Sequence, residues 1–330
     1  MCPSNIKIET PCRMHITLID ENGELCRVDG GIGVSLEKPQ VVMEGKLGGD
    51  LVVEGVQKDL VTSLAKRFLD HYGLEEGDYL KVYEKIPEHV GLGSKTQLSL
   101  ATATILSKLH GIKATTRELA HIMGRGGTSG IGVAAFEDGG FILDGGHSFG
   151  PDKEKKEFLP SRASKAKPAP VLAKYNLPEE WYWVVTIPNV KRGASGEEEF
   201  NIFQKHCPIP SEDVEKLCRL IFMVTLPAIV ERDLEVFGQS LTKIISLGFK
   251  KIEVELQNPI IKNLLNTLME NGAEGIGMSS FGPTTFAITE GKKRAEDLMK
   301  TASDLLNEKE ISGKFFITPT RNKGAFIEET

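Results

Sequence analysis

Hydrophobic and polar residues alternate along the chain with two periods, one typical of strands and one typical of helices. Period-two alternation, or a short apolar run between turn residues, predicts strands at 14–19, 28–36, 41–44, 51–54, 79–83, 140–144, 181–188, 285–288 and 315–318. Helical periodicity with capping residues and glycine stops predicts helices at 59–73, 97–106, 116–123, 133–136, 211–226, 233–248, 258–270 and 291–306. Because strands and helices mix without a regular βαβ repeat, the pattern favours an α+β fold.

A change of composition divides the chain. Residues 151–180 hold five prolines and several basic side chains, which indicates a linker that runs over the surface. Its cations are expected to be solvated, with a role near an anionic substrate as the alternative. The length of 330 residues suits one large or two medium domains. We therefore predict an N-terminal domain at 1–168 and a C-terminal domain at 169–330.

A glycine-rich loop lies between a predicted strand and a predicted helix at residues 87–101. Gly91 and Gly93 allow the backbone to approach an anion closely, and the first N–H groups of the helix have no partner within it. With Lys95 adding a cation, the loop suits a phosphate. It is not a Walker A loop, because Ser94 separates Gly93 from Lys95. The alternative is an N-capped helix after a tight turn, with a solvated lysine.

Composition and charge exclude several classes of protein. The net charge of −6 argues against general nucleic-acid or membrane-surface binding, since both need a basic face. Five cysteines without CxxC spacing oppose a disulfide framework and a zinc site, and suit a reducing cytoplasm. No signal peptide is evident, and the longest apolar run, at 220–230, is too short to span a bilayer. We expect a cytoplasmic protein, with a homodimer as the default assembly.

Three glycine-rich turns follow one another in an order that resembles the GHMP kinase superfamily. Residues 10–18 are similar to its first motif, residues 87–97 to its second, phosphate-binding motif, and residues 272–284 to its third. The resemblance implies a two-domain α+β fold, with an N-terminal domain like ribosomal protein S5 and a ferredoxin-like C-terminal domain.

Within that superfamily, a closer resemblance covers nearly the whole chain. The chain resembles the β-ribofuranosylaminobenzene 5′-phosphate synthases at 13–20, 27–33, 126–132, 143–147, 158–161, 193–198 and 277–284. This resemblance implies an archaeal enzyme of methanopterin biosynthesis. Such an enzyme joins the ribose phosphate of phosphoribosyl pyrophosphate to 4-aminobenzoate or 4-hydroxybenzoate, releases CO2 and pyrophosphate, and uses Mg²⁺. The sequence does not choose between the two acids, because an amine and a hydroxyl differ by one local contact.

The matched motifs supply candidate site residues. Candidate catalytic residues are Arg13, His15, Asp29 and Asp144, and candidate Mg²⁺ ligands are Asp20 and Asp29, because Mg²⁺ prefers carboxylate oxygens. Candidate substrate- or phosphate-binding residues are Gly91, Gly93, Ser94, Lys95, Thr96, Gln97, Arg125, Gly126, Gly127, Thr128, Ser129, His147, Ser279, Ser280 and Gly282.

Local chemistry leaves alternatives for several of these residues. Arg13 and His15 alternate with core residues on one strand, so both can face the same side. Arg13 suits a bidentate contact with phosphate or carboxylate, whereas His15 could equally be a hydrogen-bonded structural residue. The aspartates could instead cap turns, and the second and third glycine turns could serve turn geometry alone.

Two other functions remain open. A kinase of the same superfamily usually has Gly-Leu-Gly-Ser-Ser-Ala in its second motif and an aspartate soon after the second glycine turn. This chain has Lys95-Thr96 after Ser94, and no acidic residue follows Gly130 until Glu137, which weakens an ATP-dependent kinase. A non-catalytic sensor of a phosphate ligand is the other alternative, and the three glycine turns with Arg13 disfavour it.

Overall fold

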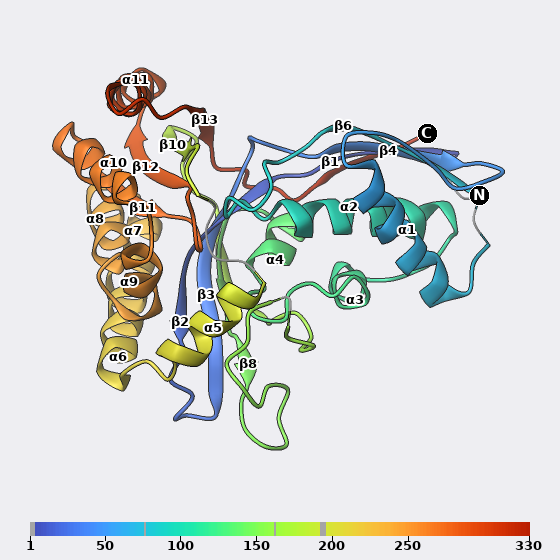
Figure 1. The fold of residues 1–330 in the computed structure, drawn as a ribbon, viewed down its shortest axis with the longest axis horizontal. Coiled ribbons are helices and arrows are strands. Elements are labelled where there is room, and N and C mark those ends of the chain that lie inside the picture. Colours follow the sequence, from blue (N-terminus) through green and yellow to red (C-terminus); the bar gives the residue numbers. More distant parts are fainter. Residues whose placement is uncertain (1–3, 76, 162, 192–195) are drawn as a thin grey trace.

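The fold is seen in a computed structural model that describes residues 4–75, 77–161, 163–191 and 196–330. The described residues form three sheets, which Figure 1 shows with helices packed against them. An N-terminal sheet and a C-terminal sheet lie at either end of the upper part of the view, and the long strands of a central sheet run down between them. The architecture is the α+β fold that the sequence predicts.

The N-terminal sheet has the strand order β14-β1-β4-β6-β5, and only the β5–β6 pair is parallel. Helix α2 packs on β1 and β4, and α1 packs on α2. Helix α1 buries Val61, Leu64 and Phe68 on one face and ends at Gly73, whose φ of 62° is left-handed as expected for a glycine stop. The bounds are β1 Asn5–Glu9, β4 Val42–Leu47, β5 Val52–Gly55, α1 Lys58–Tyr72, β6 Asp78–Glu84, α2 Ser94–Leu109 and β14 Phe326–Glu329.

The central sheet has the order β2-β3-β7-β9, with β8 paired to β3, and its named pairs are antiparallel. The β2–β3 register shifts between His15 and Thr17, as at a β-bulge, which redirects side chains near a site. The bounds are β2 Cys12–Asp20, β3 Arg27–Leu36, β7 Phe141–Asp144, β8 His147–Ser148 and β9 Val171–Tyr175. Helices α3 Thr116–Ile122 and α4 Ile131–Glu137 lie on the same side as α2.

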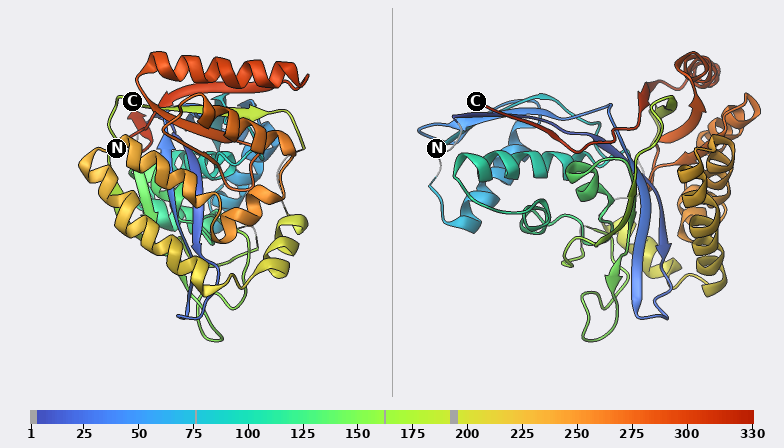
Figure 2. Two further views of the ribbon diagram at one scale, coloured as in Figure 1. Left: turned by 90° about the vertical axis from the view of Figure 1, so that its left-hand side faces the viewer. Right: turned by 180° about the vertical axis from the view of Figure 1, so that it is seen from behind.

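The C-terminal sheet has the antiparallel order β11-β12-β10-β13. Helices α10 and α11 pack on it, while α6 and α9 contact β2 of the central sheet. Figure 2 shows the orange helices standing along one side of the central strands. The bounds are β10 Trp181–Pro188, α5 Glu197–His206, α6 Ser211–Leu220, η1 Ile221–Thr225, α7 Leu226–Glu231, α8 Leu234–Ile244, α9 Gly248–Glu255, α10 Pro259–Glu270, β11 Gly275–Met278, β12 Thr285–Glu290, α11 Lys292–Glu308 and β13 Gly313–Pro319.

An aromatic cluster joins the central and C-terminal sheets. Phe237 of α8 stacks on Trp181 at 5.4 Å between ring centroids and meets Phe141 of β7 edge-on at 5.9 Å. Trp183 meets Phe286 edge-on at 5.5 Å, and its indole N–H donates to Thr320 Oγ1 at 2.8 Å. Such pairs prefer tilted or offset contacts, and buried indoles need a partner for their N–H. One hydrophobic core therefore runs through both halves of the chain.

The boundary predicted at residue 168 does not separate the sheets. Strand β9, which follows it, pairs with β7 of the first half, and β14 pairs with β1. The predicted surface linker is also partly wrong, because 171–175 is a strand and Lys155 is buried, with 3% of its surface exposed. Both the strand pairing and the burial of Lys155 depend on partners that are distant in sequence, and local composition does not reveal such partners.

Several elements differ from the predicted ones. The helix predicted at 211–226 is α6 followed by the π-helical turn η1 and then α7, and its N-cap is Pro210, without a side-chain cap from Ser211. The third glycine motif, at 272–284, contains strand β11. No described helix combines the length and the apolar character needed to cross a membrane.

Candidate active site

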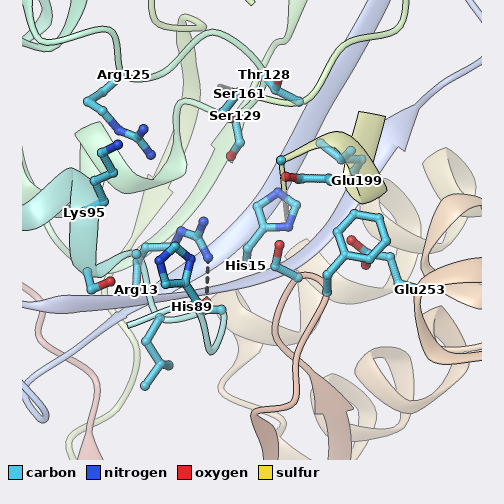
Figure 3. Close-up of a pocket in the computed structure, with 18 of the residues that line it drawn as sticks. Arg13, His15, His89, Lys95, Arg125, Thr128, Ser129, Ser161, Glu199 and Glu253 are labelled. Carbon is cyan, nitrogen blue, oxygen red and sulfur yellow. Dashed lines mark hydrogen bonds between the residues drawn. The ribbon is translucent and has the colours of Figure 1, made fainter. Parts of the chain in front are cut away.

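A pocket of about 260 Å³ opens where the three glycine turns meet strand β2. Its walls come from β2, the loop before α2, the turn after α3, and helices α5 and α9, as Figure 3 shows. The sequence predicted ten of the lining residues: Arg13, His15, Gly91, Gly93, Ser94, Lys95, Arg125, Thr128, Ser129 and Ser280. The prediction that Arg13 and His15 face the same side is confirmed, since both line this pocket.

The glycine loop at 87–101 and the glycine turn at 272–284 touch behind the pocket. Gly91 has a φ of 92°, and a Cβ at this position would lie 2.2 Å from the backbone oxygen of Ser279. The Ser279 hydroxyl donates to Gly91 O at 2.7 Å and accepts from the backbone N–H of His15 at 2.9 Å. Only glycine allows this approach, which fixes the glycine loop before α2 against β2.

Cations gather on one side of the pocket. Arg13, Lys95 and Arg125 lie together in Figure 3, near the start of α2, whose first turn holds no acidic residue. Arg13 Nη1 donates to Gly91 O at 2.7 Å, and Arg125 donates from Nε and Nη2 to Thr96 Oγ1 at 3.1 and 3.0 Å. Burial and the neighbouring Arg125 lower the pKa of Arg13 to about 10, so it stays charged at neutral pH. Two guanidinium groups and a helix N-terminus make a strong anion site.

The opposite side of the pocket holds carboxyl groups and aromatic rings. Glu199 of α5 and Glu253 of α9 face the pocket beside Phe203 and Phe281, whose ring centroids lie 6.5 Å apart. Burial and the nearby Glu253 raise the pKa of Glu199 to about 7. Burial also raises the pKa of Glu253, which forms an ion pair with Lys250. The pocket is therefore polarised, with a cationic half and an acidic, aromatic half.

His15 lies between the two halves. Its side chain is 4% exposed, and neither ring nitrogen has a hydrogen-bond partner within the described residues. Burial, Arg13 and Lys250 lower the pKa of His15 well below its ordinary value, so the imidazole is neutral. A structural histidine is expected to satisfy its buried ring nitrogens, and this one does not.

The glycine-rich turn at 124–132 is held by Asp144 at the end of β7. Asp144 Oδ2 accepts from Gly130 N at 2.8 Å, and Oδ1 accepts from Gly146 N at 3.0 Å. Burial raises the pKa of Asp144 to about 7, while the two backbone donors act in the opposite direction. Asp144 does not line the pocket, but its Oδ2 lies 3.5 Å from the hydroxyl of Ser129, which does.

Other predicted residues support the walls without lining the pocket. Gln97 Nε2 donates to Gly132 O at 2.8 Å and ties α2 to α4. A Cβ at Gly126 would meet Pro168, one at Gly127 would meet Ser164, and one at Gly282 would meet Met278. Together with Thr96 and Ser279, these residues shape the loops from behind.

Asp29 and His147 lie in a buried cluster away from the pocket lining. Lys155 Nζ donates to the two Asp29 oxygens at 2.7 and 2.9 Å, and His147 Nδ1 lies 2.5 Å from Asp29 Oδ2. His147 Nε2 lies 2.9 Å from Lys167 O. Burial and the nearby Asp29 raise the pKa of Glu21 well above its ordinary value. This cluster ties Lys155 and Lys167 to strands β3 and β8.

The two predicted Mg²⁺ ligands have other partners. Asp20 Oδ1 accepts from the backbone N–H groups of Asn22 and Gly23 at 2.8 and 3.1 Å, as in a turn cap, and Asp29 is paired with Lys155. Neither residue lines the pocket, so these two carboxylates do not fit the role of ligands to an ion held there. Within the described ranges, no group of three or more histidine, cysteine, aspartate or glutamate side chains is arranged to hold a metal.

Sequence reasoning missed part of the site. The missed residues are Leu18, His89, Leu92, Ser161, Gly196, Glu199, Phe203, Glu253 and Phe281. Seven lay within or beside matched motifs: Leu18, His89, Leu92, Ser161, Gly196, Glu199 and Phe281. Residues 193–195 of the motif at 193–198 are outside the described residues. Glu253 gave no local signal, because only the packing of α9 on β2 brings it to the pocket.

Comparison with known proteins agrees with this arrangement. Family models match at residues 59–140 (GHMP kinases N terminal domain) and 225–306 (GHMP kinases C terminal). A protein of Methanothermobacter thermautotrophicus named β-ribofuranosylphenol 5′-phosphate synthase is 46% identical, with 97% of this chain and 98% of the relative covered. Proteins of the same name from Archaeoglobus fulgidus and Methanocaldococcus jannaschii are 46% and 42% identical, covering 98% and 96% of this chain and 99% and 98% of theirs. The chain belongs to this synthase family. It is an enzyme on a GHMP kinase fold, as the resemblance implied.

Solved structures agree on the fold. Homoserine kinase from Cytophaga hutchinsonii is 16% identical with a TM-score of 0.67, over 99% of this chain and 98% of that one. Mevalonate kinase from L. major, solved with R-mevalonate, is 13% identical with a TM-score of 0.65, over 95% and 96% of the two chains. At such identities the likeness concerns architecture alone.

Proposed function

We propose that this enzyme is a decarboxylating phosphoribosyltransferase. It joins the ribose phosphate of phosphoribosyl pyrophosphate to 4-hydroxybenzoate, releasing CO2 and pyrophosphate, as an early step of methanopterin biosynthesis in the cytoplasm. The hydroxy acid is preferred to 4-aminobenzoate because the three synthases at 42–46% identity are named for a phenol product. The corresponding 4-amino compound, 4-aminobenzoate, is the second candidate substrate.

The cationic half of the pocket is the observation that supports this proposal most. Phosphoribosyl pyrophosphate carries phosphate groups at both ends of a ribose, so it needs several cations within one small cavity. Arg13, Lys95 and Arg125 line the same wall as the glycine loop that precedes α2. Guanidinium groups bind phosphate oxygens through paired hydrogen bonds, and backbone N–H groups at a helix start add further donors.

The chemistry needs positioning and electrostatic stabilisation. The ring carbon that bears the carboxylate attacks the anomeric carbon of the ribose, and the bond to pyrophosphate breaks with its electron pair leaving on the diphosphate. The carbon–carboxylate bond then breaks, CO2 leaves and its electrons restore the aromatic ring. Since CO2 leaves in place of a proton, no base has to deprotonate carbon. The cationic wall would stabilise the leaving diphosphate, and the closed walls would hold the two substrates in line.

Mg²⁺ stays part of the proposal as an ion brought by the diphosphate. Mg²⁺ commonly binds through substrate phosphates and keeps several waters, so it does not need a cage of protein carboxylates. This agrees with the other partners of Asp20 and Asp29.

One assay tests the function directly. The enzyme is incubated with phosphoribosyl pyrophosphate, Mg²⁺ and carboxyl-labelled 4-hydroxybenzoate or 4-aminobenzoate, and released CO2 is counted. We expect Mg²⁺-dependent release with at least one acid, and no release with either would refute the proposal. A parallel incubation with ATP and small alcohols tests the kinase alternative, for which ADP would appear.

A further inference from the structure

The acidic, aromatic half of the pocket has no role in the binding of phosphates. Glu199 and Glu253 face a cavity whose opposite wall binds anions, so a second anion is not their expected ligand. Phe203 and Phe281 add apolar surface beside them. Carboxyl groups beside aromatic rings suit a planar ring that carries a hydrogen-bond donor.

Two observations point to a ligand at this position. His15 is 4% exposed, lines the cavity, and has two ring nitrogens without a hydrogen-bond partner among the described residues. Glu199 lines the same cavity, beside Phe203. Buried polar groups are rarely left without partners, so a substrate group is expected to supply them.

We propose that Glu199 accepts the hydrogen bond of the 4-hydroxyl group of the aromatic acid, with His15 beside it, and takes the hydroxyl proton as the ring attacks the ribose. This inference rests on the proposed function. It assigns to that reaction an acceptor for the proton of the 4-hydroxyl group. The 4-position lies across the ring from the attacking carbon, so the acid would span the pocket with its carboxylate towards the cationic half.

Electron flow in the ring explains why this contact would accelerate the reaction. Attack leaves a positive charge spread over the ring positions ortho and para to the new bond, and the para position carries the hydroxyl. Transfer of the O–H proton to Glu199 converts the charged intermediate into a neutral dienone. When CO2 leaves, its electron pair restores the ring, and Glu199 returns the proton to the oxygen. The proton balance is therefore closed, and no other reactant is needed.

The electrostatic setting of Glu199 suits this exchange. Glu253 of α9 faces it and raises its pKa, whereas Arg125 and Arg13 act in the opposite direction. With burial the pKa reaches about 7, so the carboxylate is available at neutral pH and its acid form can return a proton. The rate should therefore rise with pH through about 7 as Glu199 ionises.

The test compares Glu199→Gln with a matched control, Glu198→Gln. Glu198 is exposed on the same helix and pairs with exposed Lys191 at 3.0 Å, outside the pocket. We expect Glu199→Gln to lower kcat with 4-hydroxybenzoate by about 10²-fold, to remove the rise in rate near pH 7, and to leave the KM for phosphoribosyl pyrophosphate unchanged. The control should keep the wild-type profile.

A binding measurement adds a readout that does not need turnover. Calorimetry compares the affinities of 4-hydroxybenzoate and benzoate, which lacks the hydroxyl, and we expect Glu199→Gln to reduce their ratio about tenfold. An unchanged ratio and pH profile would overturn the inference, even if the wild type releases CO2. A higher Mg²⁺ requirement with an unchanged ratio would also overturn it, because the carboxylate would then serve a metal. Absence of CO2 release by the wild type would instead refute the proposed function itself.

Discussion

Replacing Lys155 by methionine should destabilise the fold strongly. Lys155 Nζ lies 2.7 Å from Asp29 Oδ1, and the two side chains are 1% and 0% exposed. Methionine nearly matches the length and volume of lysine, so the substitution removes the charge with little change in packing. It leaves Asp29 buried, with His147 as its remaining partner and the carboxyl of Glu21 close by.

Breaking a buried ion pair by removing one partner costs about 3–5 kcal/mol. We expect the lower part of this range for Lys155→Met, because His147 Nδ1 stays 2.5 Å from Asp29 Oδ2 as a hydrogen-bond partner. Urea unfolding at pH 7 and 25 °C, followed by circular dichroism, measures the loss. The double variant Lys155→Met/Asp29→Asn removes both charges, so its loss should be smaller than the sum of the two single losses by about 0.5–3 kcal/mol.

A loss below about 1 kcal/mol in Lys155→Met would refute the reasoning, since an exposed pair contributes no more than that. Catalysis gives a second criterion. Asp29 does not line the pocket, so Asp29→Asn should lower stability while the folded enzyme keeps kcat within about threefold. A hundredfold loss of kcat at unchanged stability would mean that Asp29 acts in catalysis, as the sequence predicted.

Three further outcomes are expected. Lys95→Ala should raise the KM for phosphoribosyl pyrophosphate at least about tenfold, as for loss of a charge-assisted contact, and leave the melting temperature nearly unchanged; an unaltered KM would contradict phosphate binding there. Gly91→Ala should destabilise by more than about 1 kcal/mol in thermal unfolding, because its φ is 92° and its Cβ would lie 2.2 Å from Ser279 O; a stable variant would argue against this contact. Thr115→Ala removes the capping box with Glu118 and should cost about 1 kcal/mol with kcat unchanged, whereas a loss of kcat would link α3 to catalysis.

Local signals were enough for much of the fold. Helix α1 was predicted because the residues of its apolar face and its stop at Gly73 all lie within one short stretch of sequence. The helix after the glycine loop was predicted from residue 97, three residues later than the observed start of α2 at Ser94. Elements whose stability depends on distant partners were not seen: β14 exists as a strand through its pairing with β1.

The site residues also divide into those with a local signal in the sequence and those that depend on distant partners. Arg13 and the glycine turns were predicted because their residue types and spacing along the chain are typical of an anion site. Glu253 was not, since it reaches the pocket only when α9 packs on β2. Lys155 was expected to be solvated, and its partner Asp29 lies 126 positions away in sequence. Sequence patterns therefore revealed the cationic half of the pocket and missed the acidic half.

The pairing of β14 with β1 also bears on the order in which the chain can fold. Strand β1 is synthesised long before its neighbour β14 at Phe326–Glu329. Until those residues leave the ribosome, one edge of β1 has unpaired N–H and C=O groups that another chain could bind. The nascent N-terminal half is thus exposed to aggregation throughout synthesis of the C-terminal half, and a variant without β14 would keep that exposure permanently.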